Sequence, residues 1–87
     1  MNPANITAIN LQIEAYDICN RLEYAPHRIA FSNAINALRG ATEYITTLEQ
    51  AASIKWITAG TMGQFIVEAA DGRVPYLLAE LRAAELG

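Results

Sequence analysis

Apolar residues in the segment 5–25 fall on two opposite sides of a helix. At about 100° per residue, one side carries Ile6, Ile9, Ile13 and Tyr16, and the other carries Leu11, Ala15, Ile18, Leu22 and Ala25. A surface helix of a self-sufficient domain normally has a single apolar stripe. We therefore predict that one side docks on the rest of the chain and that the other, formed by Ile6, Ile9, Ile13 and Tyr16, is the interface of a homo-oligomer.

The alternative is that this first helix is central and enclosed by its neighbours without any oligomer. Two strips of polar residues separate the two apolar sides, one with Asn10, Glu14, Asp17 and Arg21 and one with Gln12 and Glu23. Two apolar sides that alternate with two polar strips favour a helix that packs against its own fold on one side and against a second molecule on the other.

A second helix is expected from about residue 26 to about residue 52. Its apolar side is formed by Phe31, Ala34, Ile35, Leu38, Ala41, Ile45 and Leu48, at spacings of three and four. Pro26 should end the first helix, because its ring disfavours the helical region for Ala25. Asn5 is placed to cap the first helix. The two helices are predicted to form an antiparallel hairpin with a tight corner near residues 24–28.

The segment 53–70 has two interpretations. In the first, Ser53 caps a short helical turn, Ala59 and Gly60 break it, and Thr61 caps a further helix. That helix ends at Asp71 and Gly72, since glycine takes a left-handed conformation without steric cost. In the second interpretation, residues 54–59 and 64–69 are the strands of a β-hairpin. The helical interpretation is preferred.

The last segment is predicted to be a helix with Pro75 in its first turn. Val74, Leu78 and Leu81 share one face, with Leu77 and Ala84 beside it. We therefore predict an all-α fold: one helical domain over residues 1–87, built as an antiparallel hairpin with one or two shorter helices packed across it.

Composition limits the class of partner. The 87 residues are 53% hydrophobic and 17% charged, an apolar excess that suits an interface. The net charge of −3 argues against duplex nucleic acid, which wants a basic patch. The single cysteine and an N-terminus without a secretion signal predict a cytoplasmic protein. The apolar runs are far shorter than the ~20 residues that span a bilayer, so no membrane partner is expected.

No residue cluster compels a reaction. Cys19 and His27 are the sole thiol and imidazole, and we interpret them as a small core residue and a solvated residue. One Cys and one His cannot supply the ligands that zinc needs. The segment 60–63 has two glycines but not the lysine of a phosphate-binding loop. The sequence thus predicts a non-enzyme with no metal and no cofactor.

A small anionic ligand is considered on the polar side of the second helix. Arg28, Ser32 and Arg39 lie along one line with His27 at its start, and Tyr16, Tyr24 and Tyr44 offer aromatic faces. Guanidinium groups bind phosphate bidentately and tyrosines stack on bases. His27, Arg28, Arg39 and Tyr44 are therefore the candidate ligand residues. The preferred alternative is a solvated face, with Arg39 paired to Glu43 and Arg21 to Asp17 at i and i+4.

Two resemblances bear on function. The stretch 64–82 (QFIVEAADGRVPYLLAELR) resembles a tail of small phage and mobile-element proteins. Arg28 followed by Leu38, Ala41 and Tyr44 is similar to the second helix of phage proteins that sequester cyclic oligonucleotide signals of bacterial defence. The first resemblance implies a phage or mobile-element source and is silent about activity. Together with the predicted homo-oligomer, it leads us to expect an accessory protein that binds a host defence protein and inhibits or modulates it. The second implies, as an alternative, a sponge for a cyclic nucleotide held between subunits.

Overall fold

The chain is built from helices throughout the part that the structure describes. A computed structural model describes residues 1–57 and 60–87, and these contain no strand. The elements are a short 3-10 helix η1 (Pro3–Asn5) and the α-helices α1 (Ile6–Arg21), α2 (Ala25–Arg39), α3 (Leu48–Ala52), α4 (Thr61–Ala70) and α5 (Tyr76–Leu86). The predicted all-α class is confirmed. The β-hairpin alternative is wrong, because residues 64–69 lie in α4 and residues 54–57 form turns; residues 58 and 59 lie outside the described residues.

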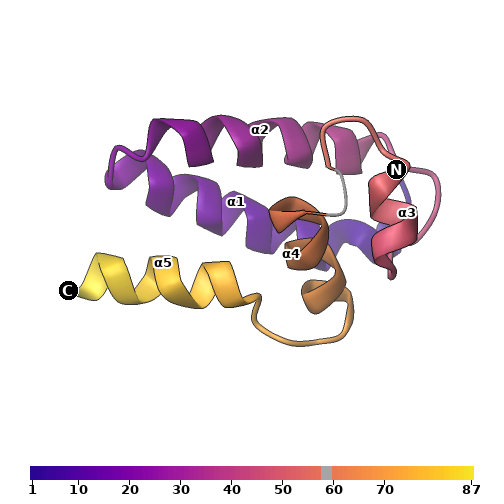
Figure 1. Ribbon diagram of the computed structural model, residues 1–87. Helices are drawn as coiled ribbons and strands as arrows, with labels where there is room; N and C mark the ends of the chain where they lie inside the picture. Colours follow the sequence, from indigo (N-terminus) through magenta and orange to yellow (C-terminus); the bar gives the residue numbers. More distant parts are fainter. Residues whose placement is uncertain (58–59) are drawn as a thin grey trace.

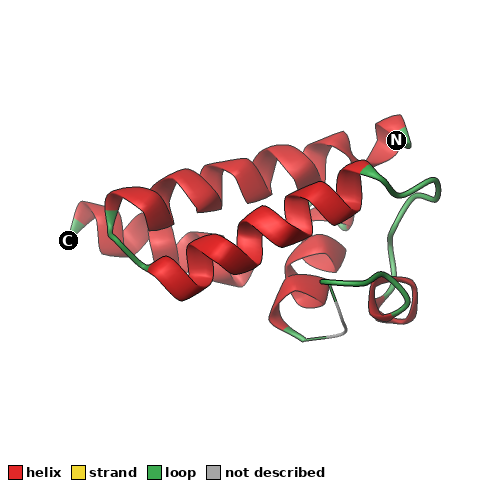
Figure 2. Ribbon diagram, turned by 90° about the horizontal axis from the view of Figure 1, so that it is seen from above, coloured by secondary structure: helices red, strands yellow, loops and turns green. Residues whose placement is uncertain are grey.

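Helix α1 is the central helix of the molecule. It packs against α2, α4 and α5, and Figure 1 shows it between α2 and α5. After α1 the chain reverses, so that α2 runs back beside it, as Figure 2 also shows. Both apolar sides of α1 therefore find partners within the chain. The alternative of a central helix thus describes α1, while Ile6, Ile13 and Tyr16 on one of these sides stay partly exposed.

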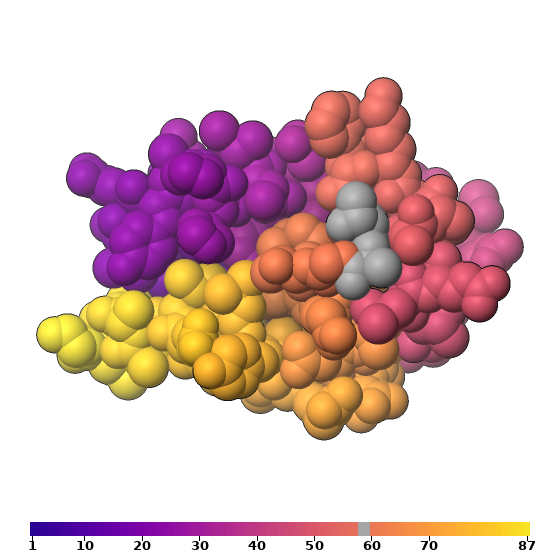
Figure 3. Space-filling model, viewed as in Figure 1, coloured from indigo at the N-terminus to yellow at the C-terminus, as the bar shows by residue number. Residues whose placement is uncertain are grey.

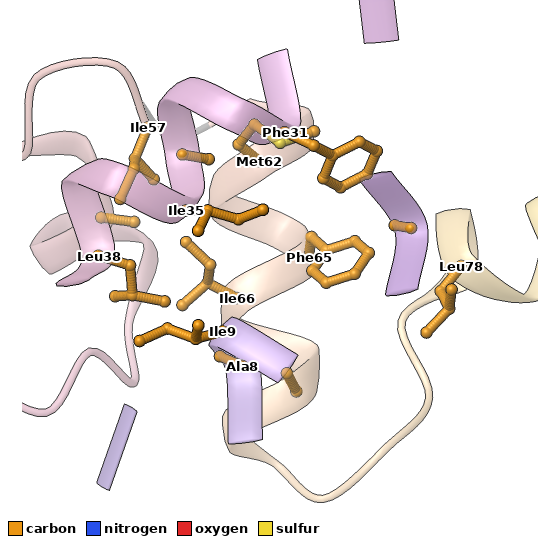
Figure 4. Close-up of a cluster of buried hydrophobic side chains, with 14 of the residues drawn as sticks. Ala8, Ile9, Phe31, Ile35, Leu38, Ile57, Met62, Phe65, Ile66 and Leu78 are labelled. Carbon is orange, nitrogen blue, oxygen red and sulfur yellow. The ribbon is translucent and has the colours of Figure 1, made fainter. Parts of the chain in front are cut away.

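The core forms between α1, α2 and α4. Phe31 of α2 and Phe65 of α4 meet edge to face, with ring centroids 5.2 Å apart and planes at 71°, a favoured arrangement for aromatic pairs. Figure 4 shows Ile35 and Ile66 beside Phe65, with Leu38 further along the same core. The predicted apolar positions of α2 from Phe31 to Leu38 are buried, as their spacing required.

Helix α2 ends at Arg39, well before the predicted end near residue 52. Gly40 is its C-cap, and residues 41–47 run as an irregular loop to α3. The side chain of Asn5 holds this loop: its Nδ2 donates to the carbonyl of Glu43 at 2.8 Å, and its Oδ1 accepts from the amide of Ile45 at 3.0 Å. Thr47 and Gln50 then form a capping box that starts α3. Asn5 thus ties the loop to the start of α1 and makes no capping bond.

The corner between α1 and α2 differs from the prediction in its boundary. Helix α1 ends at Arg21, and α2 begins at Ala25 with Pro26 in its first turn. The amide of Tyr24 donates to the carbonyl of Cys19 and the amide of Glu23 to that of Asn20, the bonding pattern of a Schellman motif. Glu23 has a left-handed φ of 61°, which a proline-based argument did not anticipate.

The end of α4 has the same motif with glycine in the left-handed position. Gly72 has a φ of 79°, and the amides of Gly72 and Arg73 donate to the carbonyls of Ala69 and Glu68. The predicted stop at Asp71 and Gly72 is confirmed. The two helix ends are thus equivalent, but the left-handed position is occupied by Glu23 after α1 and by Gly72 after α4.

Exchanging Glu23 for glycine is expected to raise the free energy of unfolding by about 1 kcal/mol, because glycine tolerates a positive φ that a side chain disfavours. Thermal and urea unfolding followed by circular dichroism would measure it. The matched control is Gly72→Ala, which places a side chain at the equivalent position of α4 and should destabilise by a similar amount. A destabilised Glu23→Gly variant would contradict the left-handed conformation of residue 23.

Three further boundaries differ from the prediction. Gly60, and not Thr61, is the N-cap of α4, and Ser53 is the C-cap of α3 and starts no new helix. Pro75 is the N-cap of α5, so Val74 lies before the helix and is 51% exposed while Leu78 and Leu81 are buried. No helix among the described residues has the length and apolar character to cross a bilayer.

Candidate functional site

The four candidate ligand residues do not come together. Arg28 donates from Nη1 to Oδ1 of Asn20 at 3.0 Å, and Arg39 lies about 16 Å further along α2 at 1.5 Å per residue. Tyr44 donates its hydroxyl to the carbonyl of Ala70 at the end of α4, at 3.3 Å. His27 is exposed and borders a separate hollow with Pro26. A single subunit therefore offers no shared anion site from these residues.

Cys19 and His27 lie in different environments, one buried and one exposed. Cys19 is fully buried in the core, and burial raises the pKa of its thiol. A nucleophilic cysteine needs a lowered pKa and access to solvent. His27, by contrast, is an exposed residue in the first turn of α2. The structure agrees with the interpretation of Cys19 as a small core residue.

Two ion pairs join α1 to α5. Arg82 donates from Nη2 to Oε1 of Glu14 at 2.7 Å, and Arg21 donates from Nη2 to Oε1 of Glu85 at 2.9 Å. Hydrogen bonds from the two arginines hold the pKa of Glu14 and of Glu85 below the usual value. The predicted pairing of Arg21 with Asp17 is therefore wrong, because α5 brings Glu85 closer. The two ion pairs hold α5 against α1, and the carboxylates of Glu14 and Glu85 are occupied by arginines.

Of the four residues predicted as an oligomer interface, only Ile6 is largely exposed. Its exposed fraction is 48%, whereas Ile9 is 3% exposed and belongs to the core. Ile13 and Tyr16 are half-buried against that core. Ile9 cannot contact another molecule in this conformation, because it is buried in the core, where Figure 4 shows it beside Ile66. The predicted stripe is thus interrupted at Ile9.

A groove nevertheless runs beside Ile13 and Tyr16, between α1 and α2. It has a volume of about 270 Å³ and is lined by Ile13, Tyr16, Asp17, Ser32, Ile35, Asn36 and Arg39. We call it the α1–α2 groove. It combines an apolar floor with one acidic and one basic side chain.

Trp56 is a largely exposed aromatic residue next to a hollow. Its side chain belongs to the turn that follows α3, its exposed fraction is 59%, and its φ is 79°. Nζ of Lys55 lies 5.1 Å from the centre of its ring, within the range of a cation–π contact. Figure 3 shows the segment before residue 58 standing out from the molecule beside α2.

Trp56 borders two hollows along α2. The smaller, about 340 Å³, is lined by Pro26, His27, Ala30, Trp56, Ile57, Thr61 and Met62. The larger, about 510 Å³, is lined by Asn36, Ala37, Gly40, Ala41, Thr42, Glu43, Ile45, Gln50, Ser53, Ile54, Lys55 and Trp56. Trp56 and these two hollows are called the Trp56 surface below. The residues Ala30 and Ala37 of α2 leave room on either side of the indole.

Sequence reasoning missed this surface. It placed Trp56 inside a helical turn or a strand, where an aromatic residue is expected to be buried. The left-handed φ of a residue that is neither glycine nor asparagine is not visible in a pattern of apolar positions. The available signal was the single tryptophan in a segment whose periodicity fitted no element well.

Nothing among the described residues forms a metal site, since no group of three or more His, Cys, Asp and Glu side chains is found there. Comparisons of the chain with protein-family models, curated protein sequences and solved structures give no match.

Proposed function

We propose that the protein acts by binding another protein through the Trp56 surface. The observation that carries this proposal is the indole of Trp56, which is 59% exposed on a backbone with a φ of 79°. A non-glycine residue in that region costs on the order of 1–2 kcal/mol. The chain itself leaves most of the indole in contact with water, and a partner protein would bury it.

The chemistry of the surface suits a protein partner. Tryptophan is enriched among the residues that dominate protein interfaces, and such residues lie beside well-packed pockets. The smaller hollow is mainly apolar, with Ala30, Ile57 and Met62 in its lining, and it can accept an apolar side chain of the partner. The larger one offers amide and carboxylate groups from Asn36, Gln50 and Glu43, which can bond to the polar rim of an interface.

The proposed class of protein is the one expected from the tail over residues 64–82: a phage or mobile-element accessory protein that is not an enzyme. It would modulate a host protein by occupying a surface of that protein, and it would act as a homo-oligomer. This mode of action needs no reacting group, in keeping with a buried Cys19.

Replacing Trp56 with alanine is expected to abolish partner binding while leaving the fold intact, since the indole is exposed. Immobilised wild type and Trp56→Ala are exposed to a bacterial lysate, and a protein retained by the wild type alone is then purified and titrated against both. An affinity loss of about 30-fold or more is expected from removing an aromatic hot spot.

The matched control is Tyr76→Ala, which removes an aromatic side chain that is 69% exposed at the start of α5. It should bind like the wild type. Equal binding by Trp56→Ala and the wild type would overturn the proposal, provided that circular dichroism shows the same helicity for both.

A further inference from the structure

We propose that the α1–α2 groove is the contact between two copies of this chain, paired antiparallel about a two-fold axis. This inference rests on the proposed homo-oligomer and names its surface. Symmetric dimers use the same patch on both subunits, so the patch must complement itself. The α1–α2 groove meets that condition through its charges and its apolar floor.

The apolar floor is continuous across the two helices. Ile13 and Tyr16 of α1 and Ile35 of α2 line it, and Ile13 and Tyr16 are only half-buried by the chain itself. Ile6 lies two turns before Ile13 on nearly the same side of α1 and is 48% exposed. A second copy would cover this strip, which includes three of the four residues predicted as the interface.

The charges lie at opposite ends of the groove. Arg28 bonds to Asn20 at the corner of the two helices, and α2 runs back from there along α1. Asp17 is therefore near the corner, whereas Arg39 is the last residue of α2. Asp17 lies three residues from Asn20 and Arg39 eleven from Arg28, so their positions along the helices differ by about 12 Å at 1.5 Å per residue.

Both charges are available to a second molecule. Among residues 1–57 and 60–87, the guanidinium of Arg39 makes no ion pair and no hydrogen bond. The carboxylate of Asp17 makes none either, because Arg21, its neighbour on α1, is bound to Glu85. A two-fold axis through the middle of the groove would place Asp17 of each copy against the partner's Arg39. Both ion pairs form at once, and the apolar floors cover each other.

Charge reversal tests this arrangement. The wild type is expected to sediment as a dimer in analytical ultracentrifugation at micromolar concentrations. The proposed dimer contains two Asp17–Arg39 contacts. Either Asp17→Arg or Arg39→Asp turns both contacts into pairs of like charge, which should weaken self-association by about 100-fold or more. Both positions are exposed, so each variant should fold.

Mixing the two variants restores the pairing. One subunit with Asp17→Arg and one with Arg39→Asp again present opposite charges at both contacts, so an equimolar mixture should form a heterodimer. The double variant Asp17→Arg with Arg39→Asp should dimerise by itself for the same reason. Asp71→Arg and Arg73→Asp, which make the same charge changes in an exposed pair after α4, are the matched controls and should dimerise like the wild type.

The outcomes separate the groove from the oligomer. A wild type that is monomeric over the whole concentration range would overturn both the proposed homo-oligomer and this inference. A dimeric wild type whose single variants remain dimeric would overturn the groove alone. Failure of the mixture to associate, when both single variants are monomeric, would overturn the antiparallel pairing of Asp17 with Arg39.

Discussion

Replacing Asn5 with alanine is expected to lower the free energy of unfolding by about 2–4 kcal/mol, because a buried hydrogen-bonding group that loses its partner costs about 1–3 kcal/mol. Asn5 is 1% exposed, and its amide bonds to the backbone of both Glu43 and Ile45. A domain of this size has a total stability of about 5–15 kcal/mol, so urea unfolding would show a large shift.

The control for this prediction is Asn2→Ala. Asn2 is also an asparagine with two hydrogen bonds, to Ala4 and to the carbonyl of Thr42, but both are solvent-exposed. Water can replace them, so the expected loss is below about 1 kcal/mol. Equal losses at the two positions would contradict the role of Asn5 in holding residues 43–45.

Replacing Gln12 with methionine is expected to raise the free energy of unfolding by about 2 kcal/mol. Gln12 of α1 is 0% exposed, and neither Nε2 nor Oε1 has a hydrogen-bond partner among the described residues. Burying an amide without partners costs roughly 1–3 kcal/mol on the protein mutational scale. Methionine has a similar length and no branching, so it fills the same space without that cost. Thermal unfolding would measure the gain.

Two variants bracket this result. Gln64→Met makes the same change at an exposed position of α4 and should stay within about 0.5 kcal/mol of the wild type. Gln12→Glu would bury an unpaired carboxylate and should be strongly destabilising. A loss of stability in Gln12→Met would contradict the prediction and show that the amide is satisfied in solution.

The sequence pattern predicted the helical class and the core positions of α2, because Phe31, Ile35 and Leu38 recur with the helical period. It also revealed that α1 has two apolar sides. Periodicity reports which residues avoid water and does not report which element covers them. Helix α5, which is held to α1 through Glu14 and Arg82, is one of the elements that cover it. Contacts so distant in sequence leave no local signal.

The boundaries that failed have a common physical cause. The apolar period continues to Ile45, which is 3% exposed, so the pattern indicates a helix where the chain forms a loop. What stabilises the loop is the side chain of Asn5, some forty residues earlier in the chain. The left-handed Glu23 is a similar case, since the Schellman bonds and not the residue type determine its conformation.

For the candidate sites, the sequence identified charged and apolar residues without their grouping. His27, Arg28, Arg39 and Tyr44 were grouped by position in a longer helix that the structure does not contain. Because α2 ends at Arg39, Tyr44 lies outside this helix, and its hydroxyl bonds to the carbonyl of Ala70. Ile13, Tyr16 and Arg39 come together in the α1–α2 groove, an arrangement that depends on how two helices align.

The central place of α1 also constrains how the protein is made. Helix α1 is synthesised before α5, and its bonds to Arg82 and Glu85 join residues 68 and 64 positions apart in sequence. Residues 82–85 must therefore be synthesised before the side of α1 that carries Glu14 and Arg21 is covered. Contacts this distant slow folding and leave apolar surface exposed during synthesis. A nascent chain that stalls before α5 would keep an open flank, and it is there that a chaperone is expected to bind.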